Sequence, residues 1–376
     1  MQFRDLKKQY EVLKEKMNKA VLQVMSDANY ISGKQVVELE QQLADYVGVK
    51  NCITCANGTD ALTLALMAWN IGEGNAVFVP DFTFFASAET VAYEGATPIF
   101  VDVEENTFNM SIASLEQAIE TVIKEGKLKP KAIVSVDLFG QPADYIKIRE
   151  IANRYGLLIL EDAAQGFGGR IGEKKACSFG DIATTSFFPA KPLGCYGDGG
   201  AIFTDNDEWA DLIRSYRIHG KGSDKYDNIR IGMNSRLDTL QAAVLQVKLQ
   251  AFEEYELEAV NVIANRYTEA LSNIVKTPLV KDGFYSSWAQ YSILLDSEEQ
   301  RNGLQAFLKE KGIPSMIYYP KAMHEQGAFQ NTLCTVVDLG ATKALCKRVL
   351  ALPMHPYLEE TEQNKVIEAI KEYLNR

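Results

Sequence analysis

The chain has 376 residues, of which 47% are hydrophobic and 24% are charged, a composition typical of a folded protein large enough for more than one core. Its formal net charge is −11, with Lys and Arg mixed among the acids, which argues against a nucleic-acid partner. No apolar run reaches about 18 residues, and the N-terminus is charged and amphipathic, so we expect no membrane span, no signal peptide and a cytoplasmic location.

The six cysteines lack the paired spacing of a zinc site or a small disulfide scaffold, so we expect reduced thiols. They are Cys52, Cys55, Cys177, Cys195, Cys334 and Cys346. Cys52 and Cys55 have C-x-x-C spacing, but they lie where a short strand runs into a loop, and no second Cys or His pair follows. A redox or metal role is therefore the less favoured interpretation.

Between about residues 35 and 240, short apolar runs alternate with amphipathic helical patterns, which predicts βα units around a mainly parallel sheet. Four runs are expected to be strands buried on both faces: 75–80, 97–103, 131–137 and 157–162. Four helices are expected between them: 59–69, 84–94, 111–123 and 144–155.

Residues 240–268 keep a helical period without Pro or Gly, which predicts a long helix that bridges two lobes, with a hinge. Beyond it, a smaller α+β unit is expected from a run at 288–295, a helix at 297–311, the short run 313–320 and C-terminal helices. We therefore predict a large domain at 1–245, which includes the N-terminal helix, and a small domain at 246–376.

Unusual polar residues follow the predicted strands, and in an open α/β sheet ligands bind at the carboxyl ends of the strands. The turn at 57–60 opens into a helix whose first N–H groups suit a phosphate, although an ordinary capped helix start fits equally well. Asp162 ends the most apolar strand, where a carboxylate needs a cation or a strong donor, such as a protonated heteroaromatic nitrogen. An Asp that caps the next turn is the alternative.

Lys191 lies between Pro189 and Pro192 and precedes a glycine-rich loop, so its backbone is expected to be irregular but constrained. Most surface lysines only aid solubility. A lysine in so apolar a segment instead predicts a desolvated amine with a lowered pKa, able to form a Schiff base. The segment 232–238 alone indicates only a helix-capping loop.

Taken in order, these motifs resemble the DegT/DnrJ/EryC1/StrS family of sugar aminotransferases over essentially the whole chain. The motifs that carry the resemblance are ANGTDAL, PDFTFFASAE, EDAAQGFG, SFFPAKPLGCYGDGGAIFT and GMNSRLDTLQAA. The resemblance implies the α/β fold type I of pyridoxal-phosphate enzymes: a large domain with a mixed, mostly parallel seven-stranded sheet, and a smaller α+β C-terminal domain. It also implies a homodimer with shared active sites.

The resemblance implies pyridoxal 5′-phosphate as cofactor, with pyridoxamine 5′-phosphate as its intermediate form. Lys191 matches the lysine that forms the internal aldimine, and Asp162 the carboxylate that pairs with the pyridine nitrogen. Gln165 matches the group beside the 3-hydroxyl. Because Asp162 would keep the ring protonated, the ring could accept electrons during the reaction.

Further matching residues would hold the phosphate or the ring. At the phosphate, the resemblance places Gly58, the backbone N–H groups of Thr59 and Asp60, the Ser186 hydroxyl and Asn234 of the neighbouring subunit. Phe84 would pack flat against the ring, although by itself it would be predicted to be a core residue.

The implied reaction has two stages: L-glutamate donates its amino group to the cofactor, which passes it to a ketone of a nucleotide-linked sugar. Lys191, once freed, would move a proton as general base and acid, with ping-pong kinetics. The match is closest to enzymes that aminate UDP-2-acetamido-2-deoxy-3-oxo-glucuronate for lipopolysaccharide O-antigen.

Four residues are expected near the substrate: Arg236, Tyr318, Tyr319 and His324. Arg236, or else Arg230 or His324, could bind the uronate carboxylate, but an arginine at the diphosphate would serve equally well. For one of the two tyrosines, a buried aromatic pair is the alternative.

Other interpretations stay open. The substrate could be another 3-keto or 4-keto sugar linked to UDP or dTDP. A related dehydratase would carry histidine in place of Lys191, and a non-catalytic sugar-nucleotide sensor would be expected to lose Lys191 or Asp162. A plain nucleotide-binding protein would need a glycine-rich or Walker loop after a strand, which the sequence lacks.

Overall fold

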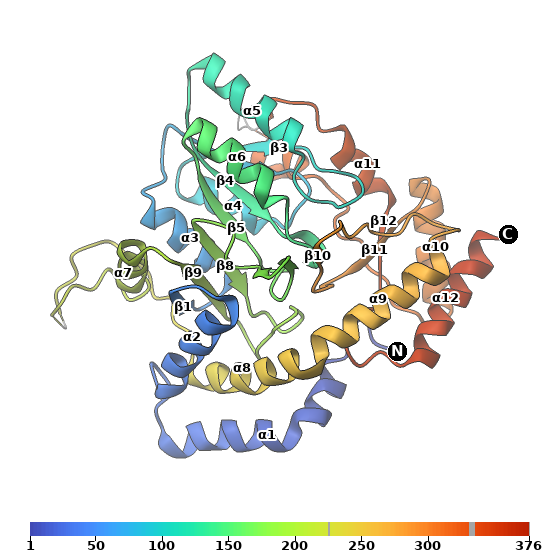
Figure 1. Cartoon of the computed structure of the whole chain (residues 1–376), viewed down its shortest axis with the longest axis horizontal. Helices are drawn as coiled ribbons and strands as arrows, with labels where there is room; N and C mark the ends of the chain where they lie inside the picture. The colour runs from blue at the N-terminus through green and yellow to red at the C-terminus, as the bar shows by residue number, and fades with distance from the viewer. Residues whose placement is uncertain (225, 331–334, 376) are drawn as a thin grey trace.

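The computed structural model describes residues 1–224, 226–330 and 335–375. Its centre is a seven-stranded sheet in the order β1-β9-β8-β5-β4-β2-β3 (Figure 1). The strands are β1 (Asn51–Cys55), β2 (Asn75–Pro80), β3 (Thr97–Val101), β4 (Lys129–Val136), β5 (Leu158–Asp162), β8 (Ile182–Ser186) and β9 (Gly200–Thr204). Only β9 is antiparallel to its neighbours, β1 and β8. The predicted mixed, mostly parallel sheet is confirmed.

The four predicted strands are present as β2, β3, β4 and β5, with ends shifted by a residue or two. They are buried on both faces over most of their length, because helices cover both sides of the sheet. Strand β8 was not predicted. Its sequence IATTS is not a continuous apolar run, and it is buried because it lies between β5 and β9 and is covered by α3.

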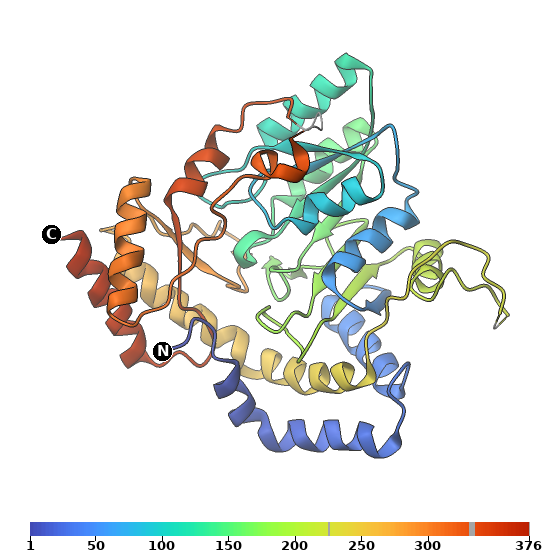
Figure 2. The same cartoon turned by 180° about the vertical axis from the view of Figure 1, so that it is seen from behind.

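Helices α5 (Ile112–Glu125) and α6 (Tyr145–Tyr155) lie on one face of the sheet, and α3 (Gly58–Ala68) and α4 (Ala86–Tyr93) lie on the other (Figures 1 and 2). All four correspond to predicted helices. Helix α5 shows the physical basis, because its buried residues Leu115, Ala118, Ile119 and Val122 follow the helical period and form one apolar face.

The predicted long helix is confirmed as α8 (Thr239–Ala251), a π-helical turn η2 (Phe252–Glu256) and α9 (Leu257–Leu271), which continue one another along one side of the molecule (Figure 1). A π turn inside a helix often lies near a functional site. Helix α1 (Leu6–Asp27) runs alongside α8, and α2 (Lys34–Val47) packs between α8 and β1.

A second hydrophobic cluster, which includes Tyr267, Tyr291, Leu304 and Ile370, lies beyond the π turn. It is built from α9, α10 (Glu298–Glu310), α12 (Glu360–Leu374) and the antiparallel strands β11 (Tyr291–Leu294) and β12 (Val349–Leu352). We call this part the small lobe. The run 313–320 forms no strand, although Met316 makes an isolated bridge to Ala351 of β12.

The remaining elements connect these parts. They are β6 (Arg170–Ile171), β7 (Lys174–Lys175), β10 (Phe284–Tyr285), α7 (Asp207–Tyr216), α11 (Gly340–Arg348) and the 3-10 turns η1 (Leu138–Gly140), η3 (Met323–Glu325) and η4 (Gly327–Phe329). The larger cluster also takes in Met323 and Phe329, so the tail of the chain packs on the large sheet as well. The domain division near residue 245 stays a prediction. Within the described ranges, no helix is both long and apolar enough to cross a membrane.

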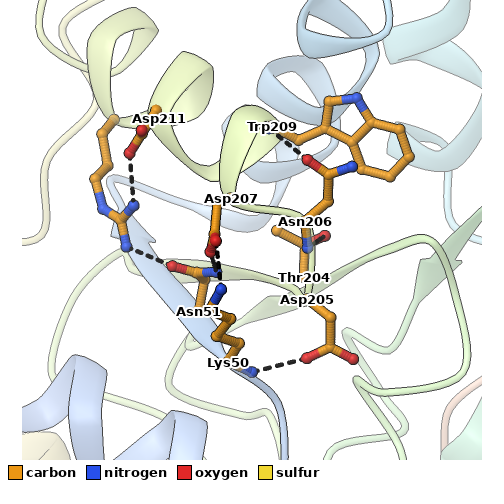
Figure 3. A network of polar contacts seen from close by, with 9 residues as sticks. Lys50, Asn51, Thr204, Asp205, Asn206, Asp207, Trp209 and Asp211 are labelled. Carbon is orange, nitrogen blue, oxygen red and sulfur yellow. Dashed lines mark hydrogen bonds and ion pairs between the residues drawn. The ribbon is translucent and has the colours of Figure 1, made fainter.

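The outer edge of the sheet is tied to α7 by polar contacts (Figure 3). Asn206 caps the helix by accepting a hydrogen bond from the Trp209 N–H at 3.0 Å. The Asn51 side chain donates to Asp207 at 3.1 Å and accepts from Arg214 at 2.9 Å. These contacts fix α7, whose end leads into the segment 217–236, part of which extends away from the body (Figure 1).

The five cysteines that the structure describes are free and buried, whereas Cys334 lies outside the described residues. Cys52 and Cys55 lie on β1, as the sequence predicts. Burial raises the pKa of the Cys55 thiol to about 12, and its Sγ donates to the Asn57 carbonyl at 3.2 Å. A thiol of this kind is a poor nucleophile and a poor metal ligand.

Candidate active site

The site begins at the carboxyl ends of neighbouring strands. β5 and β8 are parallel, with Asp162 opposite Thr184, and they end at the same edge of the sheet. Cys55 of β1 and Ser186 of β8 are both paired with Gly200 of β9. The segments that follow β1, β5 and β8 are therefore brought together, as expected for an open α/β sheet.

The start of α3 forms a cradle for an anion. A Cβ atom built on Gly58 would lie 2.7 Å from the Ser186 Cβ, so only glycine allows this close approach. The Gly58 and Thr59 N–H groups come before the first hydrogen bond of the helix ladder, from Ala61 to Asn57. A phosphate would meet these groups, the helix dipole and the Ser186 hydroxyl.

Asp60 differs from its predicted role. Its N–H donates to the Asn57 side chain at 2.8 Å as part of the helix cap, rather than being left for a phosphate. Its carboxylate accepts a hydrogen bond from Ser235 at 2.7 Å, and the same hydroxyl accepts from the Ala56 N–H at 3.0 Å. Asp60 therefore links the cradle to the segment that carries Asn234 and Arg236.

Asp162 is 5% exposed. One carboxylate oxygen accepts a hydrogen bond from Ser87 at 2.7 Å, and the other accepts from the Ala164 N–H at 3.2 Å. The residue therefore caps the next turn, which was the alternative interpretation, while the pairing of its buried carboxylate with a cation stays a prediction. Burial raises its pKa, so a nearby cation would stabilise the ionised form. The sequence contained Ser87 in a quoted motif, but nothing local gave it this role.

Lys191 lies in the loop between β8 and β9, in neither helix nor strand, as predicted. Its N–H donates to the Phe188 carbonyl at 2.9 Å, and the Cys195 N–H donates to the Phe187 carbonyl at 2.8 Å, which closes the loop. Burial lowers the pKa of the Lys191 amine, while the Asp162 carboxylate opposes that shift. The direction of this pKa shift agrees with the sequence analysis, and the ability of the amine to form a Schiff base stays a prediction.

Aromatic side chains from distant segments border the site. Gln165 accepts a hydrogen bond from the Phe139 N–H at 2.8 Å and donates to the Tyr319 hydroxyl at 3.0 Å. The Tyr319 ring lies 6.4 Å from the ring of Phe84, which is 55% exposed. The prediction from sequence alone that Phe84 is a core residue is therefore wrong. Tyr318 is half-buried beside Tyr319, with ring centroids 5.8 Å apart.

His324 is held by a buried carboxylate. Its ring Nδ1 lies 2.6 Å from Asp81 Oδ2, and its backbone N–H donates to Asp81 Oδ1 at 2.8 Å. Asp81, which follows β2, is fully buried. Burial raises the pKa of Asp81, while the contacts with His324 oppose the shift. The ring orientation is thus fixed by a residue that the sequence did not single out.

Asn234 and Arg236 lie together on the segment that follows α7. Arg236 Nη2 donates to Asn234 Oδ1 at 2.7 Å. Asn234 is exposed, and Arg236 is half-buried. The backbone of Asn234 is bridged to Ile218, within the same segment.

An anion cradle, a buried carboxylate, a desolvated lysine amine and an open aromatic ring thus meet at one edge of a mostly parallel sheet. These groups fit the phosphate, the ring nitrogen, the aldehyde and the ring face of pyridoxal 5′-phosphate. The fold and the site define a pyridoxal-phosphate-dependent enzyme of fold type I.

Comparison with known proteins agrees. The model of the DegT/DnrJ/EryC1/StrS aminotransferase family matches residues 11–371, and the chain belongs to this family. A Pseudomonas aeruginosa protein named UDP-2-acetamido-2-deoxy-3-oxo-D-glucuronate aminotransferase is 44% identical, over 98% of both chains. A Geobacillus stearothermophilus protein named pleiotropic regulatory protein is 41% identical, over 98% of this chain and 97% of its own.

A solved structure of a DegT DnrJ EryC1 StrS aminotransferase from Brucella abortus is 51% identical, with a TM-score of 0.97 and full coverage of both chains. The predicted family, fold class, enzyme class and cofactor are therefore confirmed. The chain is a pyridoxal-phosphate-dependent aminotransferase.

Proposed function

We propose that this enzyme transfers the amino group of L-glutamate to the C3 keto group of UDP-2-acetamido-2-deoxy-3-oxo-glucuronate. The observation that carries the reaction type is the meeting of the Lys191 amine, the Asp162 carboxylate and the cradle at Gly58 and Ser186. The substrate is supported by the name of the 44% identical relative, which spans 98% of this chain.

When bound, the cofactor supplies an electron sink for the carbon that loses its proton. Asp162, oriented by Ser87, would hold the proton on the ring nitrogen. The first turn of α3 and the Ser186 hydroxyl would bind the phosphate. The amine of Lys191 would anchor the aldehyde carbon and, once released, act as general base and acid. A lowered pKa suits this role, because a neutral amine can accept the proton.

The remaining groups would place the ring and the sugar. Gln165 would lie beside the 3-hydroxyl, with its amide N–H donating to the Tyr319 hydroxyl. Phe84 would cover the ring face. Arg236 would bind the uronate carboxylate, since a guanidinium matches a carboxylate with two parallel hydrogen bonds. Tyr318 and His324 would border the sugar nucleotide.

We also propose a homodimer in which Asn234 and Arg236 serve the neighbouring subunit's site. Two features support this. Asn234 is exposed in the single chain, and the segment before it carries Ile229 and Ile231, which are 55% and 91% exposed. Apolar side chains clustered on a projecting segment are typical of a surface that a partner covers.

Two alternatives have specific support. Amination of another 3-keto or 4-keto sugar linked to UDP or dTDP would use the same cofactor groups, since the cofactor supplies the same chemistry to any ketone that the site admits. A regulatory role is favoured by the name of the 41% identical relative. The presence of Lys191 and Asp162 argues against a purely regulatory chain. The cytoplasmic location and the role in O-antigen synthesis stay predictions, which cell fractionation and sugar analysis of a deletion strain would check.

The first experiment is the absorption spectrum of the purified protein with pyridoxal 5′-phosphate, for the wild type and Lys191→Ala. We expect the band of lysine-bound cofactor in the wild type only. L-glutamate should convert it to the amine form, and one keto-sugar nucleotide from a panel should restore it.

The panel separates the alternatives. Restoration by the 3-keto uronate supports the proposed substrate, and restoration by a different sugar replaces it. A wild-type protein that binds no cofactor covalently would contradict the assignment of Lys191 and favour a regulatory role.

A further inference from the structure

We propose that Arg4 is a positioning residue for Lys191, because its guanidinium holds the main chain of the lysine loop and joins that loop to the small lobe. The inference rests on the proposed role of Lys191 as cofactor anchor. Neither the motifs of the family resemblance nor the polar residues at the strand ends include Arg4.

The contact is direct. Arg4 Nη2 donates to the Lys191 carbonyl at 2.6 Å and lies 3.4 Å from the Pro192 carbonyl. A guanidinium offers several donors in a rigid plane, so one side chain can hold two successive carbonyls. Pro192 has no N–H, so the peptide that joins Lys191 to Pro192 can be held by a hydrogen bond only at its carbonyl. The Lys191 side chain starts from the same backbone.

The charge of Arg4 lies in a mostly buried setting. Burial lowers the pKa of Arg4 to about 10, and the attraction of Glu256 opposes that shift. Burial lowers the pKa of Lys248 and of His355, and the positive charge of Arg4 adds to the lowering of each. At neutral pH Arg4 is therefore still charged, with Glu256 of the π turn as its opposing charge.

Arg4 also acts on the amine of Lys191 itself. Burial is the largest cause of the lowered Lys191 pKa; Asp162 raises that pKa, and Arg4 adds to the lowering. Removing the charge at position 4 should thus raise the pKa of the lysine. A residue that only stabilised the fold would leave it unchanged.

The segment that carries Arg4 links the lysine loop to the small lobe. The Phe3 carbonyl accepts a hydrogen bond from the Met354 N–H at 3.2 Å, and the Phe3 ring lies 6.2 Å from the Tyr318 ring. Tyr319, which follows Tyr318 in the chain, accepts the hydrogen bond from the Gln165 side chain. A single short segment therefore contacts the backbone of the lysine and Tyr318, one of the aromatic residues expected at the sugar.

The test uses the full-length protein without cofactor. Pyridoxal 5′-phosphate is added across a range of pH, and the rate of covalent attachment is followed by absorption. For Arg4→Met we expect attachment about tenfold slower, as for the loss of one charge-assisted hydrogen bond. We also expect the midpoint of the plot of attachment rate against pH to shift to higher pH. Arg4→Lys, which keeps the charge, should retain most of the wild-type midpoint.

The matched control is Arg154→Met, which removes an exposed arginine paired with Glu116 on the surface. It should leave rate and midpoint unchanged. The same result for Arg4→Met, with only a lower thermal unfolding temperature, would overturn the proposal. If Arg4→Met fails to fold, Arg4→Gln is measured in the same way, and an unchanged midpoint there also overturns it. Absence of attachment in the wild type would instead refute the role of Lys191.

Discussion

At the scale of single residues, Asp162 shows how a costly group is made tolerable. A carboxylate that is 5% exposed loses most of its hydration, and the hydrogen bonds from Ser87 and Ala164 replace only part of it. Burial raises the pKa of Asp162, which reflects the remaining cost of keeping this carboxylate ionised. A protonated ring nitrogen would supply the missing positive charge, so the electrostatic cost of the buried carboxylate in the free protein favours binding of the cofactor.

Arg236 tests recognition of the sugar. Arg236→Ala should lower kcat/KM for the 3-keto uronate by about 10- to 100-fold, because a charge-assisted pair is lost, and should lower it only slightly for the neutral 3-keto sugar. Steady-state kinetics with both nucleotides measures the difference.

Arg230→Ala is the matched comparison, since Arg230 lies in the same segment as Arg236 and donates a hydrogen bond to Ser215 of α7 at 3.3 Å. Equal losses for both sugars in Arg236→Ala would rule out the carboxylate role. A loss confined to the uronate in Arg230→Ala would transfer that role to Arg230.

At the scale of elements, helix termini fix the active-site groups more than helix interiors do. The Asn57 cap sets where α3 begins, and this places Gly58 against Ser186. The Asn206 cap sets where α7 begins, and α7 leads into the segment with Asn234. Caps are short-range hydrogen bonds, so they define helix ends with little help from the rest of the fold.

The cap of α7 can be compared with a surface ion pair that lies next to it. Asn206→Ala should reduce the free energy of unfolding by about 1 kcal/mol, because the Trp209 N–H loses its acceptor. Lys50→Met removes the ion pair with Asp207 and should cost less than the loss of the cap, because both side chains are exposed and water screens their attraction. Urea unfolding of both variants gives the order, and a larger loss in Lys50→Met would reverse our ranking of these contacts (Figure 3).

At the scale of the whole molecule, the proposed dimer divides each site between two chains. Lys191→Ala and Arg236→Ala subunits, unfolded and refolded together, should recover about a quarter of wild-type activity, because half the dimers are mixed and each has one intact site. Activity on the 3-keto uronate is the measurement.

The control mixes Lys191→Ala with Asp162→Ala. Those two residues lie on one chain's site, so every site stays defective and no recovery is expected. If the Arg236 mixture also fails to recover, although mixed dimers form, the sites are not shared between subunits.

Several parts of the fold were predictable because they are encoded locally. The strands β2 to β5 and the helices between them follow from apolar periodicity, and the long helix follows from a helical period without Pro or Gly. The irregular backbone at Lys191 follows from its flanking prolines, since a proline constrains its own φ and its neighbour's conformation.

The sequence by itself therefore determined the βα order, the long helix and the segments that supply Lys191, Asp162 and the α3 cradle. The tertiary structure alone decided that Phe84 is exposed, that Asp81 holds His324 across 243 residues, and that Arg4 bonds the Lys191 carbonyl across 187 residues. Periodicity and capping act over a few residues, whereas these contacts depend on which elements the folded sheet brings together, and no local pattern contains that information.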